Sequence, residues 1–422
     1  MAKILISSLG TGQKKANGYA KATYEYKDQK LTTTFISKAL ANFLDIDKLF
    51  LIGTAGSIWD SCYHEFGGNS EDIELNLYEK IDNKSLSEDD LEIVSKIITN
   101  QLGADGSKCF LIEYGINENE LWNNFDKYLQ ILNLIEDGDE VYIDISHSFR
   151  SLALMSFLMI EFGRTIKNKQ FKIGGIFYGM LEYSKENNGI TPIVDLKIFY
   201  ELMEWIKAIN AFKNYSNAEE LSLLLKNEPS TKQAHKVFSQ LSKNLEIANM
   251  HALWQFTRGI SKKINALQTS DNKIIQLLST DLMKLATRLD QPVQSAFQYE
   301  LALWLYENKN YALSYIALYE AIITKVCEEM KYNLHDHTER EEAKKHVDYP
   351  YNQWFNTKYE NSISEIRNCI VHQCQERKDF VKQDIEKLNE FLKKFEPFIK
   401  KQNVIKNKRA ACKLPKSTHN LS

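Results

Sequence analysis

Residues 365–374, EIRNCIVHQC, place an arginine and a histidine close together, with an asparagine directly after the arginine. These residues are Arg367, Asn368 and His372. Histidine exchanges a proton near neutral pH, and arginine carries a permanent charge that matches phosphate oxygens. Cleavage of RNA by its own 2′-hydroxyl needs both functions, because one group moves a proton while another stabilises the pentavalent phosphate. The three residues are therefore a candidate catalytic set that requires no metal.

The spacing of this set raises a geometric difficulty. On a helix, five steps of roughly 100° leave Arg367 and His372 about 140° apart, whereas Asn368 and His372 share a face. A helix that ends or distorts near His372 would bring the arginine within reach. Alternatively, two chains that pack about a two-fold axis would line a common cleft with two copies of the set. An isolated R-x-x-x-x-H also occurs by chance in helical proteins, so the context decides.

A second group of candidate residues follows three short apolar runs. The three loops contain Ser8, Leu9, Gly10, Thr11 and Gly12; Thr54, Ala55, Gly56 and Ser57; and Asp144, Ser146, His147, Ser148, Phe149 and Arg150. Small residues let backbone N–H groups approach an anion, and a following helix N-terminus favours negative charge. The spacing is neither a Rossmann fingerprint nor a Walker loop. A single loop of this kind could simply be a tight turn between a strand and a helix. Three such loops together favour the interpretation that they bind a nucleotide-like anionic ligand.

The first half of the chain supplies the elements that position these loops. Apolar runs at 3–12, 48–57, 108–115, 140–148 and 171–179 alternate with amphipathic segments of helical period. This alternation is typical of a parallel sheet covered by helices on both faces. We therefore expect an N-terminal, Rossmann-like, doubly wound α/β domain. In such a sheet ligands bind beyond the carboxyl ends of the strands, where the three loops lie.

The second half of the chain is predicted to be all helical. Amphipathic segments of helical period follow one another after Leu196, with a proline-containing boundary near residue 290. We expect a sensing domain at 1–198, a helical connector at 199–290, a helical catalytic domain at 291–400 and a flexible basic tail at 401–422. The polar segment 331–354 is expected to be a loop between two helices.

Composition and cysteine spacing indicate the cellular compartment and argue against a metal cofactor. The formal net charge is −3, so any nucleic-acid site must be local. Six cysteines form no Cys-x-x-Cys pair, which argues against a zinc site or a disulfide framework. His335, Asp336 and His337 lie close together, but in a polar loop they are not expected to bind a metal. We expect a cytoplasmic protein with no cofactor, no signal peptide and no membrane span.

Two motifs resemble those of a known family. The stretch RNCIVH, residues 367–372, resembles the R-x4-H motif of HEPN ribonucleases, and IDISHSFRSL, residues 143–152, resembles the D-x-T-H-G-F-R motif of CARF domains. Together, in this order, they resemble the CARF–HEPN ancillary ribonucleases of type III CRISPR systems, the Csm/Csx group. The resemblance covers most of the chain. It departs at Ser146-His147-Ser148, where the family has Thr-His-Gly, which affects how closely a ligand can approach.

This resemblance implies a function for both halves. The first domain would dimerise and bind a cyclic oligoadenylate, a tetra-adenylate or a hexa-adenylate, with the three loops and with Tyr178 and Gly179. Binding would activate the homodimer to cut single-stranded RNA through Arg367, Asn368 and His372. The connector would carry the change, because a ligand activates only by binding the competent state more tightly. No stable complex with the CRISPR effector is expected.

Two other functions stay open on the sequence. The helical half could instead be a protein- or DNA-binding module, which would make the chain a cyclic-nucleotide-sensing regulator without catalysis. A histidine beside the arginine has no purpose in such a binder, which favours the ribonuclease. The first domain could also cleave its own ligand through loop hydroxyls and His147, although no spacing in the sequence indicates this.

Overall fold

The structure is a computed structural model that describes the chain except for residues 13, 16–17, 148–149, 227–230, 373–379 and 401–422. The side chains of residues 14, 15, 18, 150, 372 and 380–382 also lie outside the description. The chain forms two compact units, Met1–Glu201 and Leu202–Ser422. Ser148, Phe149 and the predicted tail at 401–422 therefore fall outside the described residues.

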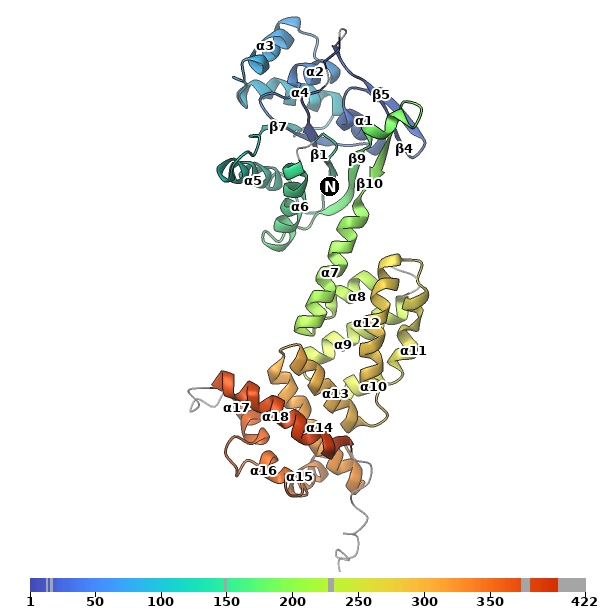
Figure 1. Ribbon diagram of the computed structural model, residues 1–422, viewed down its shortest axis with the longest axis vertical. Coiled ribbons are helices and arrows are strands. Elements are labelled where there is room, and N and C mark those ends of the chain that lie inside the picture. Colours follow the sequence, from blue (N-terminus) through green and yellow to red (C-terminus); the bar gives the residue numbers. More distant parts are fainter. Residues whose placement is uncertain (13, 16–17, 148–149, 227–230, 373–379, 401–422) are drawn as a thin grey trace, which may run out of the picture. The chain divides into compact units, whose positions relative to one another are not determined.

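The first unit contains one eight-stranded sheet in the order β5-β4-β10-β9-β8-β1-β6-β7 (Figure 1). Its strands are β1 (Lys3–Leu9), β4 (Ala22–Tyr26), β5 (Gln29–Thr33), β6 (Lys48–Gly53), β7 (Lys108–Leu111), β8 (Glu140–Asp144), β9 (Lys172–Gly179) and β10 (Ile190–Asp195). A separate small hairpin pairs β2 (Lys14–Lys15) with β3 (Gly18–Tyr19). The five apolar runs predicted as strands correspond to β1, β6, β7, β8 and β9.

These five strands are parallel to one another. If the five strands are numbered 1 to 5 along the chain, they lie across the sheet in the order 3-2-1-4-5, so the direction of strand order changes between β1 and β8. This is the doubly wound arrangement, and its switch point is where ligands bind in open α/β sheets. Consecutive residues such as Ile4 and Leu5 are fully buried because both faces of the sheet are covered. The prediction of an N-terminal, mostly parallel α/β sheet is therefore confirmed.

Helices cover both faces of this sheet. They are α1 (Ile36–Leu44), α2 (Trp59–Glu65), α3 (Glu71–Asp82), α4 (Glu92–Leu102), α5 (Glu118–Asn133) and α6 (Arg150–Thr165), with short 3-10 helices at Asp89–Leu91 and Leu181–Lys185. Leu5, Leu49 and Leu51 share a core with α1, α2 and α4. The intervening strand residues point to the opposite face, where Figure 1 shows α5 and α6.

Three strands extend the sheet beyond β9. β10 is antiparallel to β9, β4 is parallel to β10, and β5 is antiparallel to β4. β4 therefore runs opposite to β1 and β8, so its first residue lies at the same edge of the sheet as their carboxyl ends. The sequence analysis did not predict β4, β5, β10, α2 or α3.

All regular secondary structure described in the second unit is helical, as predicted. Its helices are α7 (Lys197–Tyr215, which begins in the first unit), α8 (Glu219–Lys226), α9 (Lys232–Glu246), α10 (Met250–Thr257), α11 (Ile260–Ile264), α12 (Lys273–Leu289), α13 (Gln294–Glu307), α14 (Tyr311–Met330), α15 (His337–Lys345), α16 (Tyr351–Phe355), α17 (Ile363–His372) and α18 (Phe380–Lys400), with a 3-10 helix at Asn265–Thr269. One core of buried apolar residues runs from Trp205 on α7 to Ile399 on α18.

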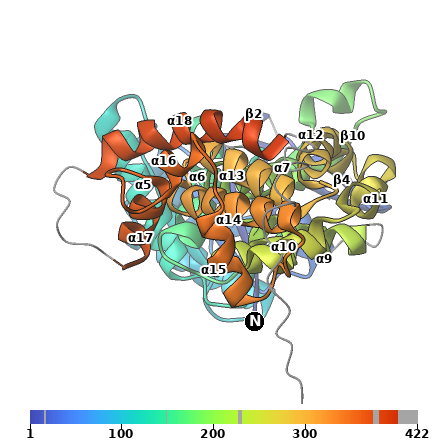
Figure 2. The ribbon, with the colours of Figure 1, turned by 90° about the horizontal axis from the view of Figure 1, so that it is seen from below.

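The polar segment 331–354 is not the loop that the sequence predicted. It contains α15 and most of α16. The side chain of Asp336 accepts a hydrogen bond from the Glu339 N–H at 2.8 Å and so caps α15. Buried Ala343 and Val347 anchor this polar stretch to the core. Figure 2 shows α18 lying across α13 and α14.

Candidate functional site

A cavity of about 430 Å³ opens at the carboxyl ends of β1 and β8 in the first unit. Nine of the residues predicted to bind a ligand line it: Ser8, Leu9, Gly10, Thr11, Gly12, Thr54, Ser57, Ser146 and His147. They come from all three predicted loops. The structure therefore brings together at one cavity the loops that the sequence placed at the strand ends, and the cavity lies at the switch point of the sheet.

The other described residues of the predicted set do not line this cavity. Ala55 faces a neighbouring groove, and Gly56 lies close to the Tyr114 hydroxyl. The Tyr178 hydroxyl donates to Glu182 at 3.3 Å. A Cβ atom added to Gly179 would lie 2.5 Å from the Cδ1 of Ile36, so this glycine packs closely against α1. The side chain of Arg150 lies outside the described part of the chain.

Asp144 is buried and does not line the cavity, but it is hydrogen-bonded to Ser146, which does. Its carboxylate accepts hydrogen bonds from the Ser7 hydroxyl at 2.6 Å and from the hydroxyl and N–H of Ser146. The Ser146 hydroxyl also accepts the Gly179 N–H at 2.7 Å, so the network joins β1, β8 and β9. Burial raises the pKa of the Asp144 carboxyl, and the Ser146 and Ser7 hydroxyls counteract part of that rise. Asp144 therefore shapes the third loop rather than contacting a ligand in the cavity.

Two glycines allow the backbone loops to approach one another. A Cβ atom added to Gly10 would lie 3.3 Å from the Cβ of His147, which brings the first and third loops into contact. Gly12 has a φ of +66°, and an added Cβ would lie 2.8 Å from the Tyr19 ring and 2.9 Å from Ile58. Gly12 therefore needs both the left-handed backbone and the absence of a side chain.

The segment between β1 and α1 adds residues to the cavity that the sequence analysis missed. Tyr19, Lys21, Tyr24 and Phe35 all line it. Burial, and to a lesser extent the charge of Asp144, raise the pKa of the Tyr24 phenol, which therefore keeps its proton. The alternating stretch ATYEY before the KD turn is typical of a strand and could have indicated this hairpin.

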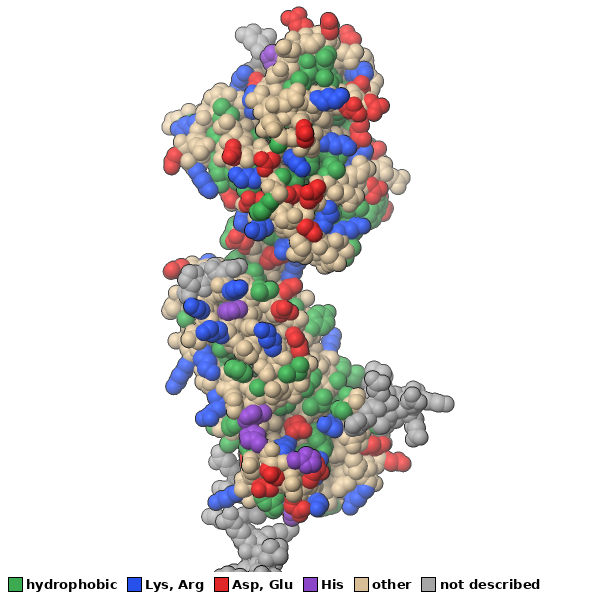
Figure 3. Space-filling view, turned by 180° about the vertical axis from the view of Figure 1, so that it is seen from behind, with side chains coloured by type: hydrophobic (Ala, Val, Ile, Leu, Met, Phe, Trp, Pro, Cys, Tyr) green, Lys and Arg blue, Asp and Glu red, His purple; other side chains and the backbone are tan. Residues whose placement is uncertain are grey.

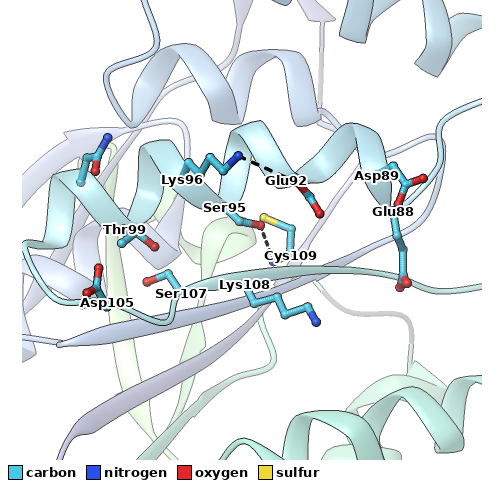
Figure 4. Close-up of a pocket in the computed structure, with 11 residues that line it drawn as sticks. Glu88, Asp89, Glu92, Ser95, Lys96, Thr99, Asp105, Ser107, Lys108 and Cys109 are labelled. Atoms are coloured by element: carbon cyan, nitrogen blue, oxygen red, sulfur yellow. Dashed lines mark hydrogen bonds and ion pairs between the residues drawn. The ribbon is translucent and has the colours of Figure 1, made fainter.

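A second groove, of about 580 Å³, runs along α4 and the edge strand β7 (Figure 4). Carboxylates outnumber lysines along it: Glu88, Asp89, Glu92 and Asp105 face Lys96 and Lys108. The Ser95 hydroxyl accepts the Cys109 N–H at 3.0 Å, and Glu88 accepts the Leu111 N–H at 3.3 Å. These side chains accept hydrogen bonds from the outward N–H groups of the edge strand and so protect the sheet edge from pairing with another strand. The excess of carboxylates makes the groove unfavourable for an anion.

In the second unit, α17 carries the predicted catalytic residues. Arg367 is half-buried, and its guanidinium lies 5.1 Å from the centroid of the Tyr319 ring on α14. It donates to the Asn368 side-chain oxygen at 3.1 Å. The buried Nε of Arg367 has no hydrogen-bond partner among the described residues. His372 lies on the same helix, but its side chain is outside the description.

Neither unit shows a metal site or a membrane span in its described residues. No group of three or more His, Cys, Asp or Glu side chains is arranged to hold a metal ion within the described ranges. None of the described helices is both long and apolar enough to cross a bilayer. Basic and acidic side chains are interspersed over the face shown in Figure 3, which agrees with the small net charge.

Comparison with known proteins identifies the class. Residues 4–182 match the family model of the CRISPR system endoribonuclease Csx1, CARF domain, and residues 201–295 match that of the CRISPR-associated protein MJ1674, second domain. The doubly wound unit with a cavity at its switch point is thus a CARF domain. The chain is a CARF-domain CRISPR-associated protein of the Csx1 and MJ1674 type, which confirms the resemblance to CARF proteins.

Two individual proteins are similar over most of the chain. MJ1674 of Methanocaldococcus jannaschii is 32% identical over 404 residues, which cover 88% of this chain and 62% of MJ1674. This chain therefore spans less than two thirds of the length of that relative. Csm6 of Enterococcus italicus, solved with cyclic hexa-2'-fluoro-hexa-dAMP bound, aligns over 93% of this chain and 92% of Csm6, with 13% identity and a TM-score of 0.41.

Proposed function

We propose that the protein is a cyclic-oligoadenylate-activated, metal-independent endoribonuclease that cuts single-stranded RNA in type III CRISPR defence. The observation that carries this proposal is the cavity at the β1–β8 switch point of a CARF domain whose family model is that of an endoribonuclease. The three loops contribute small residues such as Gly10, Thr54 and Ser146 to the lining. Small residues let backbone N–H groups approach a ligand with several phosphates.

The catalytic half of the proposal is supported by the surroundings of Arg367. A half-buried guanidinium whose buried Nε has no partner in the described part of the chain retains donor capacity for a phosphate oxygen. Tyr319 and Asn368 fix its position. In the proposed reaction the 2′-hydroxyl attacks the adjacent phosphorus and the 5′-oxygen leaves. His372 transfers the proton, Arg367 stabilises the charge of the pentavalent phosphate, and Asn368 orients the phosphate.

We further propose that the active species is a homodimer. Leu154 and Leu158 lie one turn apart on α6, and their side chains are 68% and 58% exposed. Trp122 on α5 is 61% exposed. Large apolar side chains gathered on neighbouring helices are typical of a protein interface. Pairing of two chains would also bring two copies of α17 to a common cleft, which is one of the two ways to accommodate the splayed spacing of Arg367 and His372.

An RNA cleavage assay with a panel of activators tests the proposed function. Cyclic tri-, tetra- and hexa-adenylate are each added to the protein and a single-stranded RNA in EDTA, and the product ends are analysed. We expect one ring to activate cleavage strongly and to yield 2′,3′-cyclic phosphate and 5′-hydroxyl ends. Cleavage that is independent of all three rings, or that stops in EDTA, would contradict the proposal.

A further inference from the structure

Lys21 is the only Lys, Arg, Asp or Glu among the described residues that line the cavity at the carboxyl ends of β1 and β8. It directly precedes β4, which runs opposite to β1 and β8. Its place at the cavity is therefore a consequence of the sheet topology, because the start of β4 meets the carboxyl ends of the parallel strands. The Lys21 side chain is 58% exposed, so it is free to change its conformation.

The partner of Lys21 in this structure is shared with a second lysine. The Lys21 Nζ lies 2.9 Å from one oxygen of Glu65, at the end of α2, and the Lys38 Nζ lies 3.7 Å from the other. Lys38 also donates to the Glu65 backbone carbonyl, and the Thr33 hydroxyl donates to the Glu65 carboxylate at 3.5 Å. Glu65 thus keeps a cation and a hydrogen bond when Lys21 turns away.

We propose that Lys21 is a phosphate-binding residue of this cavity and exchanges Glu65 for a phosphodiester of the bound nucleotide. The inference rests on the proposed function, because it takes the ligand to be an oligoadenylate. A lysine binds phosphate as a flexible point charge. Lys21 is 58% exposed and can leave Glu65, whose 13% exposed side chain keeps Lys38 and Thr33 as partners. In the free protein Glu65 competes with the ligand for this lysine.

Two substitutions with opposite expected effects test the inference. Lys21→Gln should weaken the binding of the activating ring about tenfold and reduce the salt dependence of binding. Glu65→Gln should tighten binding several-fold, because it removes the competitor while leaving Lys38 in place. Lys30→Gln is the matched control, since Lys30 on β5 pairs with Glu25 on β4 at 3.1 Å and does not line the cavity.

The measurement is equilibrium binding of cyclic tetra- and hexa-adenylate to the full chain at low and high salt. RNA cleavage at saturating ring is measured in parallel and should keep the wild-type rate in the control Lys30→Gln. Equal affinities of Lys21→Gln and Lys30→Gln, or weaker binding by Glu65→Gln, would overturn the role of Lys21 and leave the proposed function standing. Absence of ring binding by the wild-type protein would overturn both.

Discussion

Arg367 is held by an aromatic arrangement within the second unit. Its guanidinium lies over Tyr319, and the Tyr319 ring stacks on Phe355 with a centroid distance of 5.3 Å and an interplanar angle of 15°. Tyr319 is only 7% exposed, so it is a fixed platform. A cation over a partly desolvated ring gains roughly 0.5–2 kcal/mol. The same contact restricts the guanidinium to positions over the ring, from which it would meet a phosphate.

The first prediction concerns this platform. Tyr319→Leu should lower the rate of ring-activated RNA cleavage by up to about tenfold, because the guanidinium loses the ring that positions it. Tyr319→Phe keeps the ring and should retain most of the activity. Thermal melting should show that both variants are folded. Equal cleavage rates for the two variants would show that the Tyr319 ring does not position Arg367.

The second prediction concerns the pH dependence of stability at Asp144. Burial raises the pKa of this carboxyl, so the native state binds its proton more tightly than the unfolded state does. Its contribution is fully present below the unfolded pKa of about 3.9 and is lost as the pH rises through the folded value. Asp144→Asn stays neutral and should not lose stability in this way.

Urea unfolding of the wild type and of Asp144→Asn across pH 4 to 8 measures this effect. The wild-type free energy of unfolding, relative to that of the variant, should fall as the pH rises, by at most about 1.4 kcal/mol per pH unit. Asparagine offers one acceptor oxygen to Ser7 and Ser146, so a pH-independent offset is also expected. Parallel curves would show that the Asp144 pKa is not raised.

At the scale of elements, the sequence predicted the parallel strands and not the antiparallel ones. β1, β6 and β8 are buried on both faces and read as continuous apolar runs. β5 is the edge strand and β4 lies next to it, and both carry alternating polar side chains because they are only partly buried. α15 forms from a polar segment because capping by Asp336 and burial of Ala343 outweigh its lack of apolar residues.

The same distinction explains which parts of the cavity could be predicted. Loops that follow parallel strands were found, because the carboxyl ends of such strands meet at one edge. Lys21 was missed, because it precedes β4, whose direction follows from pairings between distant segments. Its contribution becomes visible only once β10 is known to be antiparallel to β9 and parallel to β4. Tyr19 was missed with the local hairpin of β2 and β3.

The third prediction belongs to α6. The double variant Leu154→Lys, Leu158→Lys should convert the dimer to a monomer, because charges would be buried in the proposed interface. Ring-activated cleavage should fall with the dimer fraction. Ile247→Lys, at a 72% exposed position in the second unit, is the control and should remain dimeric. Sedimentation velocity gives the result, and a dimeric double variant would place the interface elsewhere.

At the scale of the whole molecule, activation that acts through RNA binding requires a coupling free energy between ring binding and RNA binding. Coupling of binding affinities is reciprocal, so RNA must tighten ring binding by the same factor by which the ring tightens RNA binding. The fourth prediction is that this factor lies between about 5 and 150, the usual range for allosteric proteins. His372→Ala, which should bind RNA without cutting it, allows both affinities to be measured.

The two titrations check this coupling directly. Ring affinity is measured with and without saturating RNA, and RNA affinity with and without saturating ring. Equal factors above one agree with a ligand that selects the competent state. A factor of one in both titrations would mean that the ring does not act through RNA binding, and activation would then have to lie in the chemical step.

The central claim is that α17 cuts RNA when the first unit binds its ring. The most direct test is the initial rate of cleavage of a single-stranded RNA by the wild type, His372→Ala and the control His337→Ala, each with and without the activating ring. His337 is 89% exposed on α15 and pairs with Glu341, so its loss should be neutral. We predict ring-dependent cleavage by the wild type and His337→Ala and none by His372→Ala. Equal ring-dependent cleavage by all three proteins would contradict the account.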